Sequence, residues 1–195
     1  MSRRRGHIFV LSAPSGTGKS SLIERAVREI PGIWHSVSAT TRPPRSYEKE
    51  GVHYFFLTPE DFHRRIKASG FLEWAEVFGD HYGTPSDGVD RKLEAGEDVI
   101  MDLDVQGALQ VKRRRPDATL IFVMPPSIEE LARRLRKRGA EAEDRIARRL
   151  ARAEEEMSQR TLYDYVIVNE DLDAAFRELS DIIAAHRSKA AGAGA

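Results

Sequence analysis

The sequence predicts an α/β fold in which a parallel β-sheet lies between layers of helices. Four short runs rich in Ile, Val, Leu, Phe and Met are apolar almost throughout, at residues 7–11, 99–103, 120–124 and 165–168. Such runs are typical of strands buried on both faces, as in a parallel sheet. Helical patterns alternate with the runs, and this alternation favours a sheet covered by helices. A glycine-rich segment after the first run adds a candidate phosphate-binding loop.

Four helices are expected between and after these strands. They cover residues 20–30, 106–115, 127–138 and 171–186. Pro116 is a stop signal for the second helix. Ser127 is the expected N-cap of the third, with Glu130 in the capping-box position.

Two stretches interrupt the alternation. Residues 34–84 combine strand-like pieces at 52–57 and 71–77, a helix near 59–68, and turn-forming Pro and Gly. This stretch predicts a small mixed α/β insertion. Residues 139–160 are polar and rich in Arg and Glu, and they predict a mobile helical flap.

Composition excludes several classes of protein. The 195 residues include no cysteine, which excludes disulfide frameworks, cysteine zinc sites, iron–sulfur clusters and thiol catalysis. Lys and Arg number 31 and so do Asp and Glu, and this balance argues against bulk attraction to nucleic acid or to a membrane. No segment has the roughly 20 apolar residues that a membrane span needs. A cytoplasmic protein is therefore expected, and composition leaves monomer and homo-oligomer open.

The strongest motif is Ala13-Pro-Ser-Gly-Thr-Gly-Lys-Ser20. It matches the phosphate-binding pattern G-x-x-x-x-G-K-[ST] except at Ala13, and it lies between an expected strand and an expected helix. Glycines let backbone N–H groups turn toward phosphates, and the helix N-terminus adds partial positive charge. Lys19 can reach the terminal phosphates and Ser20 can ligate Mg²⁺. The alternative, a chance glycine-rich turn, fits the flanking elements less well.

Asp102 lies near the carboxyl end of the second apolar run. An acid at the carboxyl end of a buried parallel strand lies where ligands bind, and it can hold Mg²⁺ through water. The alternative is an Asp that caps the helix beginning near Gln106.

Arginines are dense between residues 133 and 152. This segment holds nine basic residues against three acids: Arg133, Arg134, Arg136, Lys137, Arg138, Arg145, Arg148, Arg149 and Arg152. Arg134 and Arg138 share one helical face by their spacing of four. The cluster can clamp the charge that develops in phosphoryl transfer, or it can be a solvated helix surface.

A second basic feature is the Pro-stiffened segment 36–45. Arg42 and Arg45 flank a Pro-Pro turn, and Tyr54 follows nearby. These residues can grip a second phosphate or form an exposed loop, and residue types alone leave both interpretations open.

Several motifs together resemble the guanylate kinase family. They are the loop at residues 12–20, the segment 36–45, the stretch 71–84 from Phe-Leu-Glu to Tyr-Gly-Thr, and residues 102–107, 125–127, 134–139 and 166–169. The match runs from about residue 6 to 186, and the middle motif is absent from other kinases with this loop. The resemblance implies a P-loop NTPase core with a parallel sheet at 1–37, 91–126 and 161–195. It also implies a mixed α/β GMP-binding insertion at 38–90 and a helical lid at 127–160.

The resemblance implies an enzyme that transfers the γ-phosphoryl group of ATP to GMP. It places ATP against Ala13, Pro14, Ser15, Gly16, Thr17, Gly18, Lys19, Ser20, Ser21, Arg134, Arg138 and Asn169. It places the GMP phosphate against Arg42, Arg45, Tyr54 and Tyr82, and the guanine site at Ser38, Glu73, Gly83, Thr84 and Asp104, with Arg149 at the transferring group. Mg²⁺ is expected at Ser20 and Asp102, and the residues expected to assist the chemistry are Lys19, Arg42, Arg134, Arg138 and Arg149.

The proposed role of Glu73 agrees with elementary chemistry. Guanine presents N1–H and a 2-amino group on one edge, so a carboxylate can accept both hydrogen bonds, whereas adenine offers no such pair. A site built on these bonds rejects the wrong base strongly. The alternative is an exposed carboxylate on a strand.

Two features depart from the family pattern, and two further functions stay open. Ala13 replaces a glycine, and the loop 46–51 lacks the frequent Pro-Gly-Glu start. The alternatives are a non-catalytic guanylate-kinase-like module that binds phosphoproteins and a kinase for another phosphorylated acceptor. Nucleic acid is disfavoured because the arginine segment has no interleaved aromatics. The expected partners are therefore ATP and GMP, with dGMP as a further acceptor.

Overall fold

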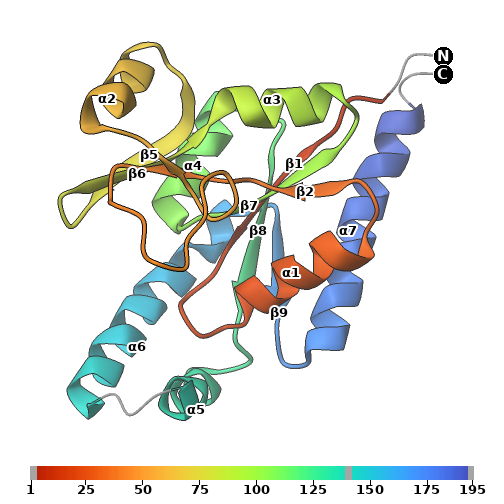
Figure 1. Cartoon of the computed structure of the whole chain (residues 1–195). Coiled ribbons are helices and arrows are strands. Elements are labelled where there is room, and N and C mark those ends of the chain that lie inside the picture. Colours follow the sequence, from red (N-terminus) through yellow and green to blue (C-terminus); the bar gives the residue numbers. More distant parts are fainter. Residues whose placement is uncertain (1–3, 139–141, 193–195) are drawn as a thin grey trace.

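The core of the protein is a five-stranded parallel sheet. The computed structural model describes residues 4–138 and 142–192 (Figure 1). The strand order is β2-β7-β1-β8-β9, with bounds Ile33–His35, Asp98–Asp102, Ile8–Ser12, Thr119–Met124 and Tyr165–Val168. Every neighbouring pair is parallel, so the predicted α/β fold with a parallel sheet is confirmed.

Helices cover both faces of this sheet and make three layers (Figure 1). On one face, α3 (Ser86–Glu94) and α4 (Val105–Arg114) pack in a cluster with Ile8 and Val10 of β1. On the other, α1 (Lys19–Glu29) and α7 (Leu172–Gly192) pack with Phe9 and Leu11. Successive side chains of a strand point to opposite faces, so burial on both sides requires the continuous apolar run seen in the sequence.

A four-stranded sheet forms the insertion beside the core. Its order is β4-β3-β6-β5, with bounds Phe55–Phe56, Ala39–Thr40, Asp80–Pro85 and Phe71–Val77, and α2 (Pro59–Lys67) covers it. Phe62 of α2 stacks on Phe71, with ring centroids 4.4 Å apart. The expected strand at 71–77 and helix near 59–68 are both present. The boundary expected at residue 90 falls within α3, whose Val89 and Leu93 pack in the core.

Two helices form the arginine-rich segment, α5 (Ile128–Arg138) and α6 (Glu143–Ser158), and a 3₁₀ turn at Gln159–Leu162 follows. Leu131 and Leu135 pack with Ala153 in a small cluster of their own. Ser127 accepts a hydrogen bond from the Glu130 amide at 3.2 Å, so the expected N-cap is present. The Glu130 carboxylate binds Arg133 and Arg134, which gives this side chain a different role from the second half of a capping box. No helix within residues 4–138 and 142–192 is long and apolar enough to cross a membrane.

Buried Asp98 ties both ends of the chain to the edge of the sheet opposite the strands' carboxyl ends. Its side chain is fully buried and accepts hydrogen bonds from Arg4 at 2.8 Å, the His7 amide at 2.8 Å and Arg187 at 2.7 Å. A buried carboxylate needs such partners, because desolvation of an unpaired charge is costly. Beside it, His7 stacks on His186 with centroids 4.6 Å apart, and each ring has a nitrogen near Thr119 Oγ1, at 2.8 and 3.3 Å.

This histidine pair predicts loss of stability in acid. Burial lowers the pKa of His7 and of His186; nearby basic groups add to this effect, and nearby carboxylates partly oppose it. A histidine with a lowered folded pKa is protonated more readily in the unfolded chain. Stability is therefore complete above the unfolded value near 6.5 and falls as the pH drops below it, by at most about 1.4 kcal/mol per pH unit for each histidine. Urea unfolding of wild type and His7→Gln between pH 7.5 and 5.5 should show a shallower fall for the variant.

The exposed His63 supplies the matched control for this experiment. His63→Gln should follow the wild-type pH profile. If His7→Gln has the same profile as His63→Gln, His7 does not contribute to the acid sensitivity.

Candidate active site

The glycine-rich loop lies at the carboxyl ends of the core strands, where ligands bind in open α/β sheets. A cavity of about 460 Å³ is lined by residues 13–20 together with Asp102, Asp104, Arg149, Arg152, Ala153 and Glu156. The phosphate loop, the two acids at the end of β7 and the arginine-rich helix α6 therefore border the same cavity.

Two glycines of the loop are required by its shape. Gly16 and Gly18 have φ values of 96° and 93°, in the left-handed region that disfavours other residues. A Cβ on Gly18 would lie 2.5 Å from Asn169 Nδ2, and one on Gly16 would lie 2.8 Å from a Leu135 methyl carbon. Helix α1 starts directly after Gly18 without a side-chain cap, so its first N–H groups are available to an anion.

Lys19 and Asp102 are in direct contact. The Lys19 ammonium lies 2.5 Å from Asp102 Oδ1 and donates to the Leu103 carbonyl at 3.1 Å. The Lys19 side chain is 16% exposed and that of Asp102 33%, so both border the cavity. The structure therefore brings together two residues that are 83 positions apart in the sequence.

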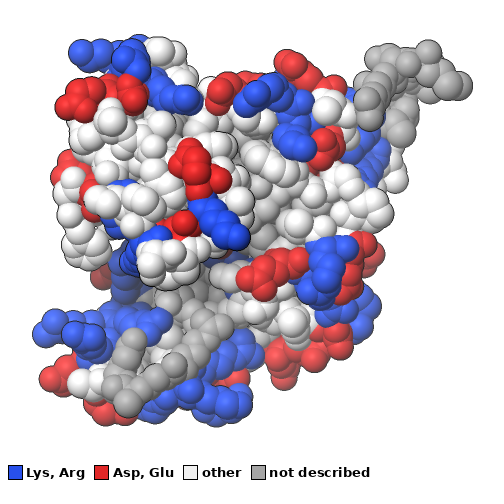
Figure 2. Space-filling view, viewed as in Figure 1, with Lys and Arg blue, Asp and Glu red and all other residues white. Residues whose placement is uncertain are grey.

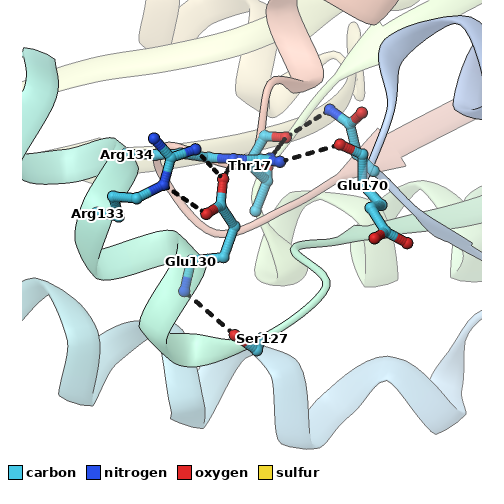
Figure 3. A network of polar contacts seen from close by, with 7 residues as sticks. Thr17, Ser127, Glu130, Arg133, Arg134 and Glu170 are labelled. Atoms are coloured by element: carbon cyan, nitrogen blue, oxygen red, sulfur yellow. Dashed lines mark hydrogen bonds and ion pairs between the residues drawn. The ribbon is translucent and has the colours of Figure 1, made fainter.

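A polar network holds the loop from the side of α5 (Figure 3). Asn169, only 5% exposed, donates its amide to the Thr17 carbonyl at 2.6 Å. Arg134 donates to the same carbonyl and to that of Glu170, each at 3.4 Å. The resemblance placed Asn169 against ATP, and in the structure its amide supports the phosphate loop. Sequence reasoning gave no signal for this contact, because 152 residues separate its partners.

Glu130 fixes the arginine of this network. It accepts from Arg134 Nε at 2.8 Å and from Arg133 at 2.7 and 2.8 Å (Figure 3). These hydrogen bonds lower the pKa of Glu130 to about 2. Glu130 was expected only as a capping residue, although its spacing of four from Arg134 is the signal for such a pair.

Basic residues of the arginine-rich helices also reach the loop. Figure 2 shows Lys and Arg gathered over α5 and α6, at the lower end of the view. The Arg149 guanidinium donates to the Ser15 hydroxyl. The side chain of Arg138 lies outside the described residues. Arg114 and Arg115 do not line the cavity: Arg114 donates to the Phe71 carbonyl and Arg115 pairs with Asp90 at 2.6 Å.

A cluster of buried or partly buried polar side chains lies in the insertion around Glu73. Glu73 is 6% exposed and accepts a hydrogen bond from the Thr84 hydroxyl at 2.7 Å, and Ser38 Oγ lies 3.5 Å from that hydroxyl. Burial raises the pKa of Glu73, while the hydrogen bonds from Thr84 partly oppose the rise. Gly83 on the adjacent strand permits the close pairing, since a Cβ there would lie 2.8 Å from the Glu73 carbonyl.

Asp104 lies between this polar cluster and the phosphate loop. Its carboxylate caps α4 by accepting from the Gly107 amide at 2.8 Å, and its carbonyl accepts from Ser12 at 3.3 Å. A Cβ on Gly107 would lie 3.3 Å from Glu73 Oε2 and 3.4 Å from Asp104 Oδ1, so both carboxylates approach the same glycine. The capping role considered for Asp102 therefore belongs to Asp104.

Two arginines and two tyrosines gather at the edge of the insertion. The rings of Tyr54 and Tyr82 meet edge-on with centroids 6.0 Å apart, and the Arg42 guanidinium lies 5.7 Å from the Tyr54 centroid. Arg45 donates to the Tyr47 hydroxyl at 3.0 Å. Sequence reasoning missed Tyr47, which lies in the loop where the chain departs from the family pattern.

Comparison with known proteins agrees with this geometry. The family model described as guanylate kinase matches residues 5–186. A guanylate kinase of Desulfitobacterium hafniense (strain Y51) is 44% identical, covering 97% of this chain and 94% of its own. One from Neisseria gonorrhoeae is 48% identical, covering 95% and 91%. The crystal structure of guanylate kinase from Anaplasma phagocytophilum aligns with a TM-score of 0.71 at 38% identity, covering 95% and 88%. With its phosphate loop, the buried Glu73 and Thr84 pair of its insertion and a match over nearly its whole length, the chain belongs to the guanylate kinase family.

Proposed function

We propose that the protein is an enzyme that transfers the γ-phosphoryl group of ATP to GMP and releases ADP and GDP. The observation that carries the proposal is the buried Glu73 carboxylate, which lies near Gly107 together with Asp104, a residue that lines the cavity at the phosphate loop. A buried carboxylate beside a phosphate site suits an acceptor with two adjacent N–H donors, as guanine has.

The transfer is a direct in-line displacement. An oxygen of the GMP phosphate bonds to the γ-phosphorus while the bond from that phosphorus to the bridging oxygen of ATP breaks, and ADP leaves with the electron pair. The attacking oxygen is already anionic, so no general base is needed. The protein acts by positioning the two nucleotides and by stabilising the charge of the transition state.

The site residues divide this work. The amides of residues 13–21 and the Lys19 ammonium hold the ATP phosphates, while Arg42, Arg45, Tyr54 and Tyr82 hold the GMP phosphate. Ser38, Glu73, Gly83, Thr84 and Asp104 form the guanine site, and Arg134, Arg138 and Arg149 place positive charge at the transferring group. The support for Arg134 and Arg149 is their contact with Thr17 and Ser15 of the loop.

The donor set near Lys19 fits Mg²⁺. Ser20 supplies a hydroxyl and Asp102 a carboxylate, both hard oxygen ligands. No group of three or more His, Asp or Glu among the described residues could hold a metal by itself, and Mg²⁺ in kinase sites uses few protein ligands together with substrate phosphates. When bound, the ion neutralises charge on the ATP phosphates.

The insertion at 38–90 and the lid at 127–160 act as moving parts on the core. In Figure 1 both project from the same side of the core sheet. Their closure over the nucleotides excludes water and so limits hydrolysis of ATP. The cytoplasm as the place of this reaction stays a prediction of the sequence.

A coupled assay of ADP formation tests the function. With ATP and Mg²⁺, GMP should be a far better acceptor than AMP, CMP or UMP, by about 10⁴-fold in kcat/KM against AMP. The deoxy analogue dGMP should also react, because each residue assigned to the acceptor recognises base or phosphate. Equal rates with GMP and AMP would refute the guanine assignment, and no turnover with any acceptor would favour a non-catalytic module.

A further inference from the structure

The carboxylate of Glu48 is nearly buried within an otherwise exposed loop. Its side chain is 5% exposed, whereas Arg45, Ser46, Tyr47 and Lys49 around it are exposed. Burial of a charge in a surface loop is costly unless the charge is paired and hydrogen-bonded. The partners of Glu48 therefore explain its position.

Glu48 binds both arginines assigned to the GMP phosphate. Arg42 Nη2 lies 2.8 Å from Glu48 Oε1 and 3.1 Å from Oε2, and the Arg45 amide donates to Oε2 at 2.7 Å. One carboxylate thus joins the side chain of the first arginine to the backbone of the second. These bonds lower the pKa of Glu48 and raise that of Arg42.

The contact leaves Arg42 able to bind a phosphate. Arg42 also donates from Nη1 to the Pro43 carbonyl at 2.6 Å, and Tyr54 lies beside its guanidinium. A guanidinium carries five N–H donors, more than these contacts use. A long side chain that is already fixed loses less conformational freedom when it binds a ligand.

We propose that Glu48 is a positioning residue for the acceptor's phosphate, which it serves by orienting Arg42 and the Arg45 backbone before GMP binds. This inference rests on the proposed function. Glu48 itself, being anionic, does not contact the phosphate. If Glu48 did not orient Arg42, removal of its negative charge would have the opposite effect: the site would be more positive and would attract the phosphate of GMP more strongly.

Glu48→Gln separates these two effects. The amide keeps the size of the side chain but is neutral and offers one acceptor oxygen in place of two, so it loses the ion pair with Arg42 and cannot accept from Arg42 and from the Arg45 amide through separate oxygens. The expected result is a KM for GMP about tenfold higher, with the KM for ATP within about twofold of wild type. An unchanged or lower KM for GMP would overturn the positioning role.

Inhibition by guanosine is a second measurement, and it distinguishes a local effect on the phosphate site from a general loss of folding. Guanosine carries the base but no phosphate, so its inhibition constant against GMP should be the same in Glu48→Gln and wild type. Equal weakening of GMP and guanosine would assign Glu48 to the stability of the insertion and overturn the proposal.

Glu50→Gln is the matched control. Glu50 lies two residues away in the same loop, is exposed, and accepts from the Phe56 amide at 2.9 Å instead of from an arginine. Its KM for GMP should stay within about twofold of wild type, since exposed substitutions away from such contacts have small effects. Failure of the proposed function would be recognised separately, because the wild-type chain itself would then not phosphorylate GMP.

The effect should also be coupled to Arg42. The KM for GMP is measured for Glu48→Gln, Arg42→Lys and the double variant. The second substitution should raise this KM little further once the first is present, because the effects of substitutions within one hydrogen-bond network do not add. Full additivity in the KM for GMP would show that Glu48 does not act through Arg42.

Discussion

Replacement of Lys19 with Ala is expected to lower kcat for GMP phosphorylation by about 10³-fold. Lys19 borders the loop cavity and contacts Asp102 at 2.5 Å, so its ammonium lies where the ATP phosphates are proposed to bind. Removal of one preorganised electrostatic group at a reacting centre costs about 10²–10³ in kcat, and positive groups in phosphoryl transfer are worth as much or more. Steady-state kinetics with saturating ATP and GMP measures the effect.

The control for Lys19 lies on the same helix. Arg28 is also cationic, but its side chain is 68% exposed and pairs with Glu29 at 2.8 Å. Arg28→Ala should retain kcat within about twofold, because an exposed ion pair contributes little. Normal turnover by Lys19→Ala would contradict the assignment of the loop as the ATP site.

Replacement of Glu73 with Gln is expected to lower kcat/KM for GMP by about 10³-fold and to leave the low activity with AMP unchanged. The carboxylate can accept from both guanine donors, while an amide presents one acceptor and a donor group that faces the donors of the base. Sites built to hydrogen-bond their substrate lose about 10⁴–10⁵ in discrimination when the match is broken. Gln retains an acceptor for the Thr84 hydroxyl, so the insertion should stay folded.

The pH dependence gives Glu73 a second test. Burial raises its pKa, so the carboxylate becomes protonated at a higher pH than a free glutamate does. As the pH falls through this raised value, kcat/KM for GMP should fall in the wild type, and Glu73→Gln should not show that decrease. Glu76→Gln, on the same strand but exposed, should behave as wild type. An unchanged GMP preference in Glu73→Gln would place guanine recognition elsewhere.

The predicted strands of the core agree closely with the structure, for a physical reason. Strands β1, β7 and β8 are buried on both faces, so their sequences are apolar without alternation and are recognisable locally. The edge strand β9 has the same apolar composition, although Val166 and Val168 are exposed and only Ile167 is buried. The edge strand β2 was missed because its three residues include an exposed His35. Helix α3 was also missed, because its apolar contribution is confined to Val89 and Leu93.

The candidate site was predictable to the extent that its chemistry is local. The phosphate loop is a contiguous segment with glycines at positive φ, so it can be recognised from the sequence alone. The contacts of Glu48 and Asp104 could not be predicted from the sequence. Glu48 follows the two arginines in a loop whose conformation the sequence left open, and Asp104 needed the fold to show that it, and not Asp102, caps α4.

The sequence by itself determined the α/β core, the phosphate loop and the chemical types of side chain available for two nucleotides. Tertiary structure alone decided which of these side chains meet. Lys19 reaches Asp102 because β1 and β7 are neighbours, Glu73 approaches Asp104 at Gly107, and Asn169 supports Thr17 from the far end of the chain. The physical reason is that periodicity and turn chemistry act between near neighbours, whereas these contacts depend on how buried surfaces pack together.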